Sequence, residues 1–208
     1  MTGFDEKLRQ GRLAESLIAR WLMRRGFSVL PAYEVEQGNG KGPRIFSTDG
    51  ELVSPDLFVF KQGDGKALWI EAKSKAAFTW HRISQSYQDG IDVRHWNDYL
   101  ALRRRIDWPL WLLFLHSPGQ VAKDNPPAMI PPTGLFGGEI TRLATCIDHR
   151  SDRWGSGGMV YWRMADLCVA GRPLARWDAA SAGMTSRGGD PASGARATCI
   201  SRSLNGIR

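Results

Sequence analysis

Two short hydrophobic segments joined by a glycine-containing turn constrain this chain more than any other feature. Residues 57–60 and 67–70 are short apolar runs, and the linker between them contains Gly63 and Gly65. Short apolar runs bounded by turn residues predict strands, and a short glycine-containing linker predicts a hairpin between them. The sequence therefore places an antiparallel strand pair at the centre of the fold.

The register of this hairpin brings charged residues together on one face. A turn centred near Gly63 and Asp64 places Asp56 opposite Glu71, with their Cβ atoms about 5 Å apart. Strand alternation then puts Lys73 on the same face as Glu71. The other face carries only apolar residues, which are Leu57, Val59, Leu68 and Ile70.

Two opposed carboxylates indicate a metal site. Like charges directly across a strand pair are destabilising, and a divalent cation compensates for them. Mg²⁺ prefers oxygen ligands, so we expect Asp56 and Glu71 to hold it, with the backbone carbonyl of Ala72 as a third ligand. Lys73 would orient or deprotonate a water, or stabilise charge on a phosphate. A solvated strand face with a weak surface ion pair is the alternative, but it leaves the opposition of Asp56 and Glu71 unexplained.

These residues carry a family resemblance. Ser54-Pro55-Asp56, a hydrophobic hairpin and then Glu71-Ala72-Lys73 resemble the signature of the PD-(D/E)XK nucleases. The segment that ends in Glu15 is similar to the one that carries the helix glutamate of restriction-endonuclease-like and Holliday-junction-resolvase-like members. The likeness spans roughly residues 10–116.

The resemblance implies a fold, a reaction and residue roles. The fold is α/β, with an αβββαβ core whose mixed sheet is flanked by helices. The reaction is Mg²⁺-dependent hydrolysis of DNA phosphodiester bonds, with Mn²⁺ expected to substitute, and the type is expected to be endonucleolytic. The resemblance assigns the metal to Asp56 and Glu71 and the assistance of the attacking water to Lys73. A catalytically silent nucleic-acid-binding module of the same fold, within a larger complex, is the alternative function.

Two further residues are candidates for the catalytic site. Glu15 lies at the edge of the apolar stripe of a helix, from where an acid can reach the metal directly or through a water. The alternative is a surface glutamate that forms a helix pair with Arg12. Gln88 is a candidate because many relatives carry a Gln there that helps to hold the site, whereas its own neighbours in the sequence give no geometric reason.

Basic residues suggest contacts with nucleic acid. The chain has a net charge of +7 and a pI near 9.7, which favours a polyanionic partner, with DNA expected and RNA left open. Lys75, Arg103 and Arg104 are candidates for phosphate contacts. Lys75 could instead be a solvated lysine, and arginines are favoured at a helix C-terminus in any case. No feature decides whether the chain forms a homodimer.

Periodicity and turn residues predict the order helix, strand, strand, strand, helix, strand. The helices are expected at 5–25 and 91–105, and the strands at 27–34, 56–60, 67–73 and 110–115. A proline-rich break then suggests a nuclease core over 1–125, an irregular extension packed on it over 126–177, with a strand at 159–162, and a disordered tail over 178–208.

Cysteine and histidine usage narrows the remaining possibilities. The three cysteines form no CxxC pair, so neither a structural zinc site nor a disulfide framework is expected, which favours a reducing compartment. The four histidines are scattered without i, i+4 spacing, so no helical metal-binding pair is expected. The charged N-terminus lacks the apolar core of a signal peptide, and the apolar run at 108–115 is too short to cross a bilayer. We therefore expect a cytoplasmic protein.

Overall fold

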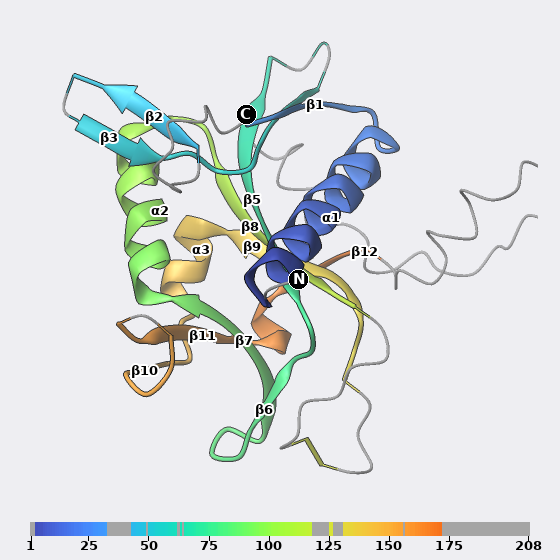
Figure 1. Ribbon diagram of the computed structural model, residues 1–208, viewed down its shortest axis with the longest axis vertical. Coiled ribbons are helices and arrows are strands. Elements are labelled where there is room, and N and C mark those ends of the chain that lie inside the picture. Colours follow the sequence, from blue (N-terminus) through green and yellow to red (C-terminus); the bar gives the residue numbers. More distant parts are fainter. Residues whose placement is uncertain are drawn as a thin grey trace, which may run out of the picture.

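A mixed six-stranded sheet forms the centre of the molecule (Figure 1). The computed structural model describes residues 3–32, 43–117 and 131–171, apart from positions 49, 62, 64 and 156, together with residues 125–126. In spatial order the strands are β1 (Phe27–Pro31), β4 (Leu57–Lys61), β5 (Ala67–Lys75), β8 (Leu110–His116), β9 (Gly134–Glu139) and β12 (Cys168–Gly171). Only β5 and β8 run parallel, so the sheet has a central parallel pair between antiparallel strands.

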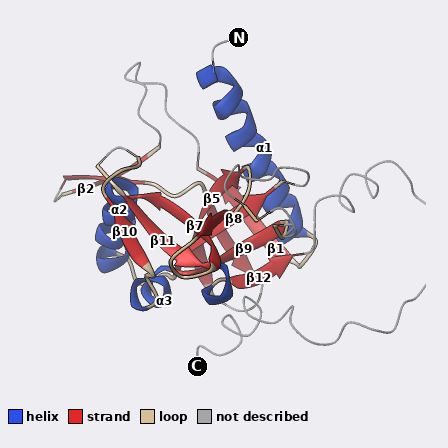
Figure 2. Ribbon diagram, turned by 90° about the horizontal axis from the view of Figure 1, so that it is seen from below, coloured by secondary structure: helices blue, strands red, loops and turns tan. Residues whose placement is uncertain are grey.

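Helices cover both faces of this sheet (Figure 2). On one face, α1 (Gly3–Met23) packs Ile18 and Leu22 onto β4, β5 and β8. On the other face, α2 (Val93–Arg105) packs Trp96 and Leu102 into a second core with β8 and β9. A sheet buried on both faces explains why every residue of β8 is buried and why that strand is apolar up to its last residue, His116.

The predicted order of elements is confirmed. The αβββαβ arrangement corresponds to α1, β1, β4, β5, α2 and β8. The hairpin register is also as predicted, because Phe60 pairs with Ala67 and Leu57 pairs with Ile70. Gly26 follows α1 with a φ of 81°, the left-handed conformation that favours glycine after a helix.

A second sheet was not predicted in full. Its spatial order is β10 (His149–Ser151), β11 (Met159–Arg163), β7 (Ser86–Asp92) and β6 (Thr79–His81). Strand β11 matches the strand expected at 159–162, but β6 and β7 lie in a stretch whose polarity hid them. The polar side chains of β7 are buried and paired inside the protein, so the strand shows no hydrophobic alternation.

Shorter elements complete the described chain. A small hairpin consists of β2 (Arg44–Ser47) and β3 (Gly50–Val53), and α3 (Ile140–Thr145) and a 3₁₀ turn, η1 (Met164–Asp166), follow β9 and β11. Between residues 131 and 171 the chain adds β9 and β12 to the first sheet and β10 and β11 to the second. The division at residues 125 and 177 stays a prediction, and the expected tail over 178–208 lies outside the described residues.

One cysteine departs from the expectation drawn from spacing. Cys168 is disulfide-bonded, whereas Cys146 carries a free thiol. One bonded cysteine is not the framework that stabilises small secreted domains, so the expected compartment stays a prediction. Among the described residues, no helix is both long enough and apolar enough to cross a membrane.

The tight packing of β9 on β8 generates a stability prediction. A Cβ atom on Gly137 would lie 2.2 Å from the carbonyl oxygen of Leu112, so we expect Gly137→Ala to lower the free energy of unfolding by about 1–3 kcal/mol. Gly11 in α1 has no neighbouring atom within 4 Å of such a Cβ, so Gly11→Ala should raise it by about 0.5–1 kcal/mol. Urea denaturation measures both, and an unchanged midpoint for Gly137→Ala would contradict the packing of these two strands.

Candidate metal centre

The side chains of Asp56, Glu71 and Lys73 meet where β4 begins. Asp56 directly precedes β4, and its Oδ2 accepts a hydrogen bond of 2.7 Å from the backbone N–H of Ala72. The Leu57–Ile70 pairing makes Glu71 the next residue across from Asp56. An ion pair links Glu71 Oε1 to Lys73 Nζ. The hairpin thus brings Asp56, Glu71 and Lys73 together, as its register predicts.

The face that carries these side chains is covered by protein, which the sequence did not indicate. Glu71 is only 4% exposed. Tyr99 of α2 makes a side-chain hydrogen bond to Glu71, and the Nζ of Lys73 lies 5.7 Å from the centroid of the Tyr99 ring. The carboxylate of Glu71 therefore lies buried between β5 and α2, where charges are less screened than on a surface.

Burial and crowding of charge shift the titration of Asp56. Removal from water and the neighbouring charge of Glu71 raise the pKa of Asp56 to about 8, despite the opposing effects of Lys73 and the Ala72 N–H. A carboxyl group with so high a pKa has too little positive charge around it. The arrangement is therefore one that a bound cation would relieve.

Lys73 keeps its proton in this setting. Burial by itself would lower the pKa of Lys73, but the charges of Glu71 and Asp56 outweigh that effect and raise it above the ordinary value. The ammonium of Lys73 is thus a fixed positive charge at the edge of the carboxylate pair.

Glu15 approaches the same centre from the opposite side of the sheet. It lies on α1, is partly buried, and interacts electrostatically with Glu71, Lys73 and Asp56. Burial and the charge of Glu71 raise the pKa of Glu15, and Lys73 and Arg12 partly offset this. Glu15 therefore lies near the carboxylate pair, while Arg12, its alternative partner, also acts on it.

The oxygen atoms present fit a hard divalent cation. Carboxylates of Asp56 and Glu71 come from neighbouring strands, and Asp56 uses only Oδ2 to accept the Ala72 N–H. In a strand the carbonyl of a residue points to the same side as its N–H, so the carbonyl of Ala72 is directed toward Asp56. Two carboxylates and a carbonyl are ligands of the type that Mg²⁺ or Mn²⁺ takes.

Gln88 lies elsewhere in the hydrogen-bond network. It is on β7 and not in a helix, and its side-chain amide donates to Asp148 Oδ2 at 2.5 Å and to Ser84 Oγ at 3.1 Å. Its neighbour Asp89 is the residue that turns toward β5, because successive strand residues face opposite sides. The described contacts therefore do not bring Gln88 to Asp56 and Glu71, and its predicted role gains no support.

The predicted phosphate-binding residues are partly engaged within the protein. Lys75 Nζ forms an ion pair of 3.0 Å with Asp89 Oδ1 and a hydrogen bond to the carbonyl of Gly90. Arg103 Nε lies 3.3 Å from Glu139 Oε1, so it links α2 to the start of α3. Arg104 is exposed and bonds its own helix at the Leu100 carbonyl. Of the three, Arg104 has the side chain with most access to solvent.

Tyr99 and His95, two residues of α2 near the centre, were not among the site residues predicted from the sequence. Burial and the charge of Lys73 lower the pKa of His95, and Glu71 also acts on it, so His95 lies near the carboxylate pair. Their i, i+4 spacing puts both on one helix face, and that was the available signal.

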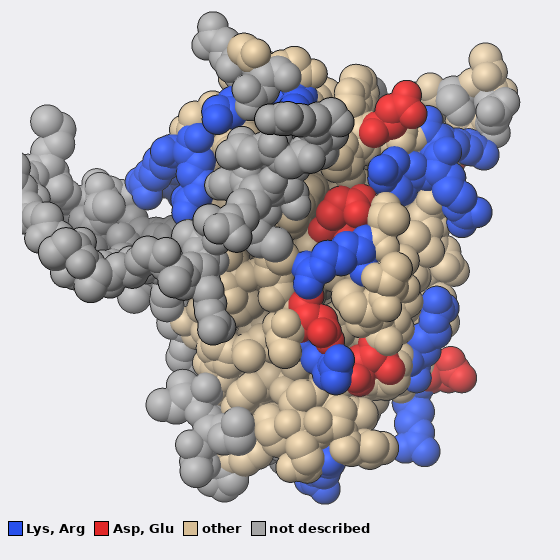
Figure 3. All heavy atoms as spheres, turned by 180° about the vertical axis from the view of Figure 1, so that it is seen from behind, with Lys and Arg blue, Asp and Glu red and all other residues tan. Residues whose placement is uncertain are grey.

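The surface charge is mixed over the face seen in Figure 3. Acidic and basic side chains alternate along the middle of that face, and further basic groups lie toward its edges. The net positive charge is therefore not collected there into a single basic patch.

No protein-family model matches the chain, and no curated protein is detectably similar to it. Among solved structures, a Holliday junction resolvase from Archaeoglobus fulgidus, Hjc, is similar over 75% of this chain and 90% of its own, with 10% sequence identity and a TM-score of 0.44.

Proposed function

We propose that the protein is a nuclease that hydrolyses phosphodiester bonds in DNA with the help of a divalent cation, Mg²⁺ or Mn²⁺. Asp56 and Glu71 hold the cation, with the carbonyl of Ala72 as a third ligand and Glu15 as a fourth, directly or through water. Gln88 has no part in this proposed site, because its side chain contacts Asp148 instead.

One observation carries this proposal: the carboxylates of Asp56, just before β4, and of Glu71, on β5, lie together at a buried position with a lysine beside them. The pKa of Asp56 is raised to about 8, so its surroundings disfavour the charged form at neutral pH. A structural role would be served better by neutral side chains of the same size. The cost of placing two acids together is expected where a cation binds.

The cation, Lys73 and Tyr99 have different roles in the proposed reaction. A divalent cation supplies Lewis-acid catalysis to the phosphate and to the attacking water. Lys73 remains protonated, so its part is to stabilise negative charge that develops on the phosphate, and to orient the water, instead of accepting a proton. Tyr99 donates to Glu71 and so holds that carboxylate in position.

DNA is the substrate that fits both the chain's charge and this chemistry. The net charge of +7 favours a polyanion, and a carboxylate-held cation acts naturally on a phosphodiester. Internal cleavage is the simplest mode, and closed circular DNA tests it because it has no ends.

Asp56→Asn tests the metal site through stability as well as activity. The folded-state pKa of about 8 lies above the ordinary 3.8, so without metal the protein should lose stability as the pH rises from about 4 through 8. We expect Asp56→Asn to raise the Tm in EDTA at pH 8 by about 3 °C or more, and to abolish both cleavage and the Tm increase caused by Mn²⁺. Differential scanning calorimetry and plasmid cleavage measure these effects.

Asp107→Asn is the matched control, because Asp107 is exposed in the loop between α2 and β8. It should leave activity and the response to Mn²⁺ unchanged. Cleavage that persists in EDTA, or an Asp56→Asn protein that still cleaves at the wild-type rate, would contradict the mechanism.

Lys73→Ala tests the fixed positive charge. Loss of a charge that stabilises the transition state should reduce kcat by about 100- to 1000-fold, while Mn²⁺ still raises the Tm. Arg105→Ala, a change at an exposed residue at the end of α2, should leave kcat unchanged. Steady-state cleavage assays give kcat, and wild-type activity in Lys73→Ala would show that the lysine has no catalytic part.

Tyr99→Phe tests the positioning of Glu71. The ring remains to pack in the core and beside Lys73, but the hydroxyl that bonds Glu71 is lost. We expect Mn²⁺ to bind about 10- to 100-fold more weakly, as when other partners of ligating residues are removed. Calorimetric titration with Mn²⁺ measures this, and an unchanged Kd would remove Tyr99 from the site.

A further inference from the structure

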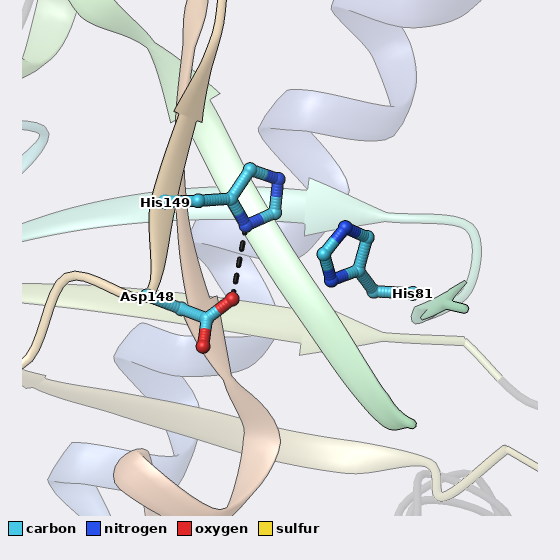
Figure 4. A group of neighbouring side chains, drawn as sticks. All are labelled: His81, Asp148 and His149. Carbon is cyan, nitrogen blue, oxygen red and sulfur yellow. Dashed lines mark hydrogen bonds and ion pairs between the residues drawn. The ribbon is translucent and has the colours of Figure 1, made fainter. Parts of the chain in front are cut away.

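A second group of metal-ligating side chains lies on the other sheet (Figure 4). His81 ends β6, Asp148 precedes β10, and His149 begins β10. The three residues offer ligand atoms that all lie within 4.8 Å of one another. Strands β6 and β10 are the two outer strands of this sheet, so the group joins segments that are 67 positions apart in the chain.

The imidazole of His149 is paired with the carboxylate of Asp148. Its Nδ1 lies 2.9 Å from Asp148 Oδ2. A carboxylate can only accept, so Nδ1 carries the proton that lies between the two atoms. A metal ion that displaces this proton would be held by Nδ1 and Oδ2 together.

His81 stacks on His149 and has two polar neighbours. The ring centroids of the two histidines are 4.3 Å apart and their planes differ by 14°. Ser84 Oγ lies 2.8 Å and Gln88 Nε2 lies 3.2 Å from His81 Nδ1, and when these groups donate, Nδ1 keeps the lone pair that accepts from them. The Nδ1 atoms of both imidazoles thus lie beside the polar side chains of this group.

Gln88 connects the members of this group. Its Nε2 lies 2.5 Å from Asp148 Oδ2, 3.1 Å from Ser84 Oγ and 3.2 Å from His81 Nδ1. The amide nitrogen of Gln88 therefore lies among the candidate ligand atoms and can hold Asp148 and His81 in position through its two hydrogens.

We propose that His81, Asp148 and His149 bind a transition-metal ion of the zinc class. Two imidazole nitrogens and one carboxylate oxygen suit Zn²⁺, which binds such ligands at about 2.0–2.2 Å. A tetrahedral ion holds its ligands about 3.5 Å apart, so small side-chain rotations that unstack the two rings bring the group to that geometry. Three protein ligands leave a fourth position for water, and the two histidines are partly exposed.

This site differs from the carboxylate pair in its chemistry. Asp56 and Glu71 provide only oxygen and suit Mg²⁺, whereas the histidine group provides nitrogen and selects softer ions. The two sites should therefore be loaded independently, and the inference does not depend on the proposed nuclease function. Bound metal would join β6 to β10 and stabilise the second sheet.

The alternative is a purely structural stack of aromatic rings. His149 also stacks on Tyr161, with centroids 4.7 Å apart, so Tyr161, His149 and His81 form a column that needs no metal. Gly90 lets Tyr161 lie close to β7, because a Cβ there would be 2.7 Å from the Tyr161 ring. Metal titration separates these two explanations.

The experiment titrates Zn²⁺ and Co²⁺ into the full chain. The background variant is Cys146→Ser, which removes the free thiol as a competing ligand. Two variants are made in this background. The carboxylate variant carries Asp56→Asn and Glu71→Gln, and the histidine variant carries His81→Ala and His149→Ala. Calorimetry gives the number of Zn²⁺ ions bound, and the Co²⁺ absorption spectrum reports the ligands.

We expect the carboxylate variant to bind one equivalent of Zn²⁺ with unchanged affinity, and the histidine variant to lose that equivalent while it still unfolds in one cooperative thermal transition. The latter result shows that the histidine variant is folded. Gln88→Leu should weaken Zn²⁺ binding by about 10- to 100-fold, and His95→Ala should leave it unchanged. Zn²⁺ binding within twofold of the background protein after loss of both histidines would overturn the proposal, as would no Zn²⁺ binding by the carboxylate variant.

Discussion

The hydrogen bond from the Ala72 N–H to Asp56 links the fold to the candidate metal centre. It fixes Asp56 beyond the last pair of the β4–β5 ladder and so holds its carboxylate beside that of Glu71. The apolar face of the same hairpin is buried under α1, and this burial prevents a slip in register, because a slip by one residue would move the acids into the core. The hydrophobic effect thus holds together two charges that would otherwise separate.

Reasoning from the sequence works best where the pattern is local. The alternation of Leu57, Val59, Leu68 and Ile70 and the short turn determine the register, and the structure has that register. Periodicity predicts helix α1 and the buried strand β8 in the same way. Gly26 predicts that the helix ends before it, as the structure shows. These features depend on neighbours a few residues apart, so a single sequence is sufficient to predict them.

The remaining features depend on contacts between distant segments. Tyr99 has the pattern of a core residue, and only the packing of α2 shows that its hydroxyl meets Glu71. His81 and His149 meet because β6, β7, β11 and β10 pair in that order, and the polar stretch that contains β7 gives no hydrophobic signal. Gln88 was assigned by resemblance alone, and the tertiary structure places it with the histidines.

The central claim is that Asp56 and Glu71 bind a divalent cation. Anomalous diffraction from crystals soaked in Mn²⁺ tests it most directly, because the ion is located without reference to activity. We predict a Mn²⁺ peak about 2.1 Å from a carboxylate oxygen of each residue, and no such peak in crystals of Asp56→Asn. Well-diffracting crystals with free access to these residues, saturating Mn²⁺ and no peak between these two carboxylates would contradict the account.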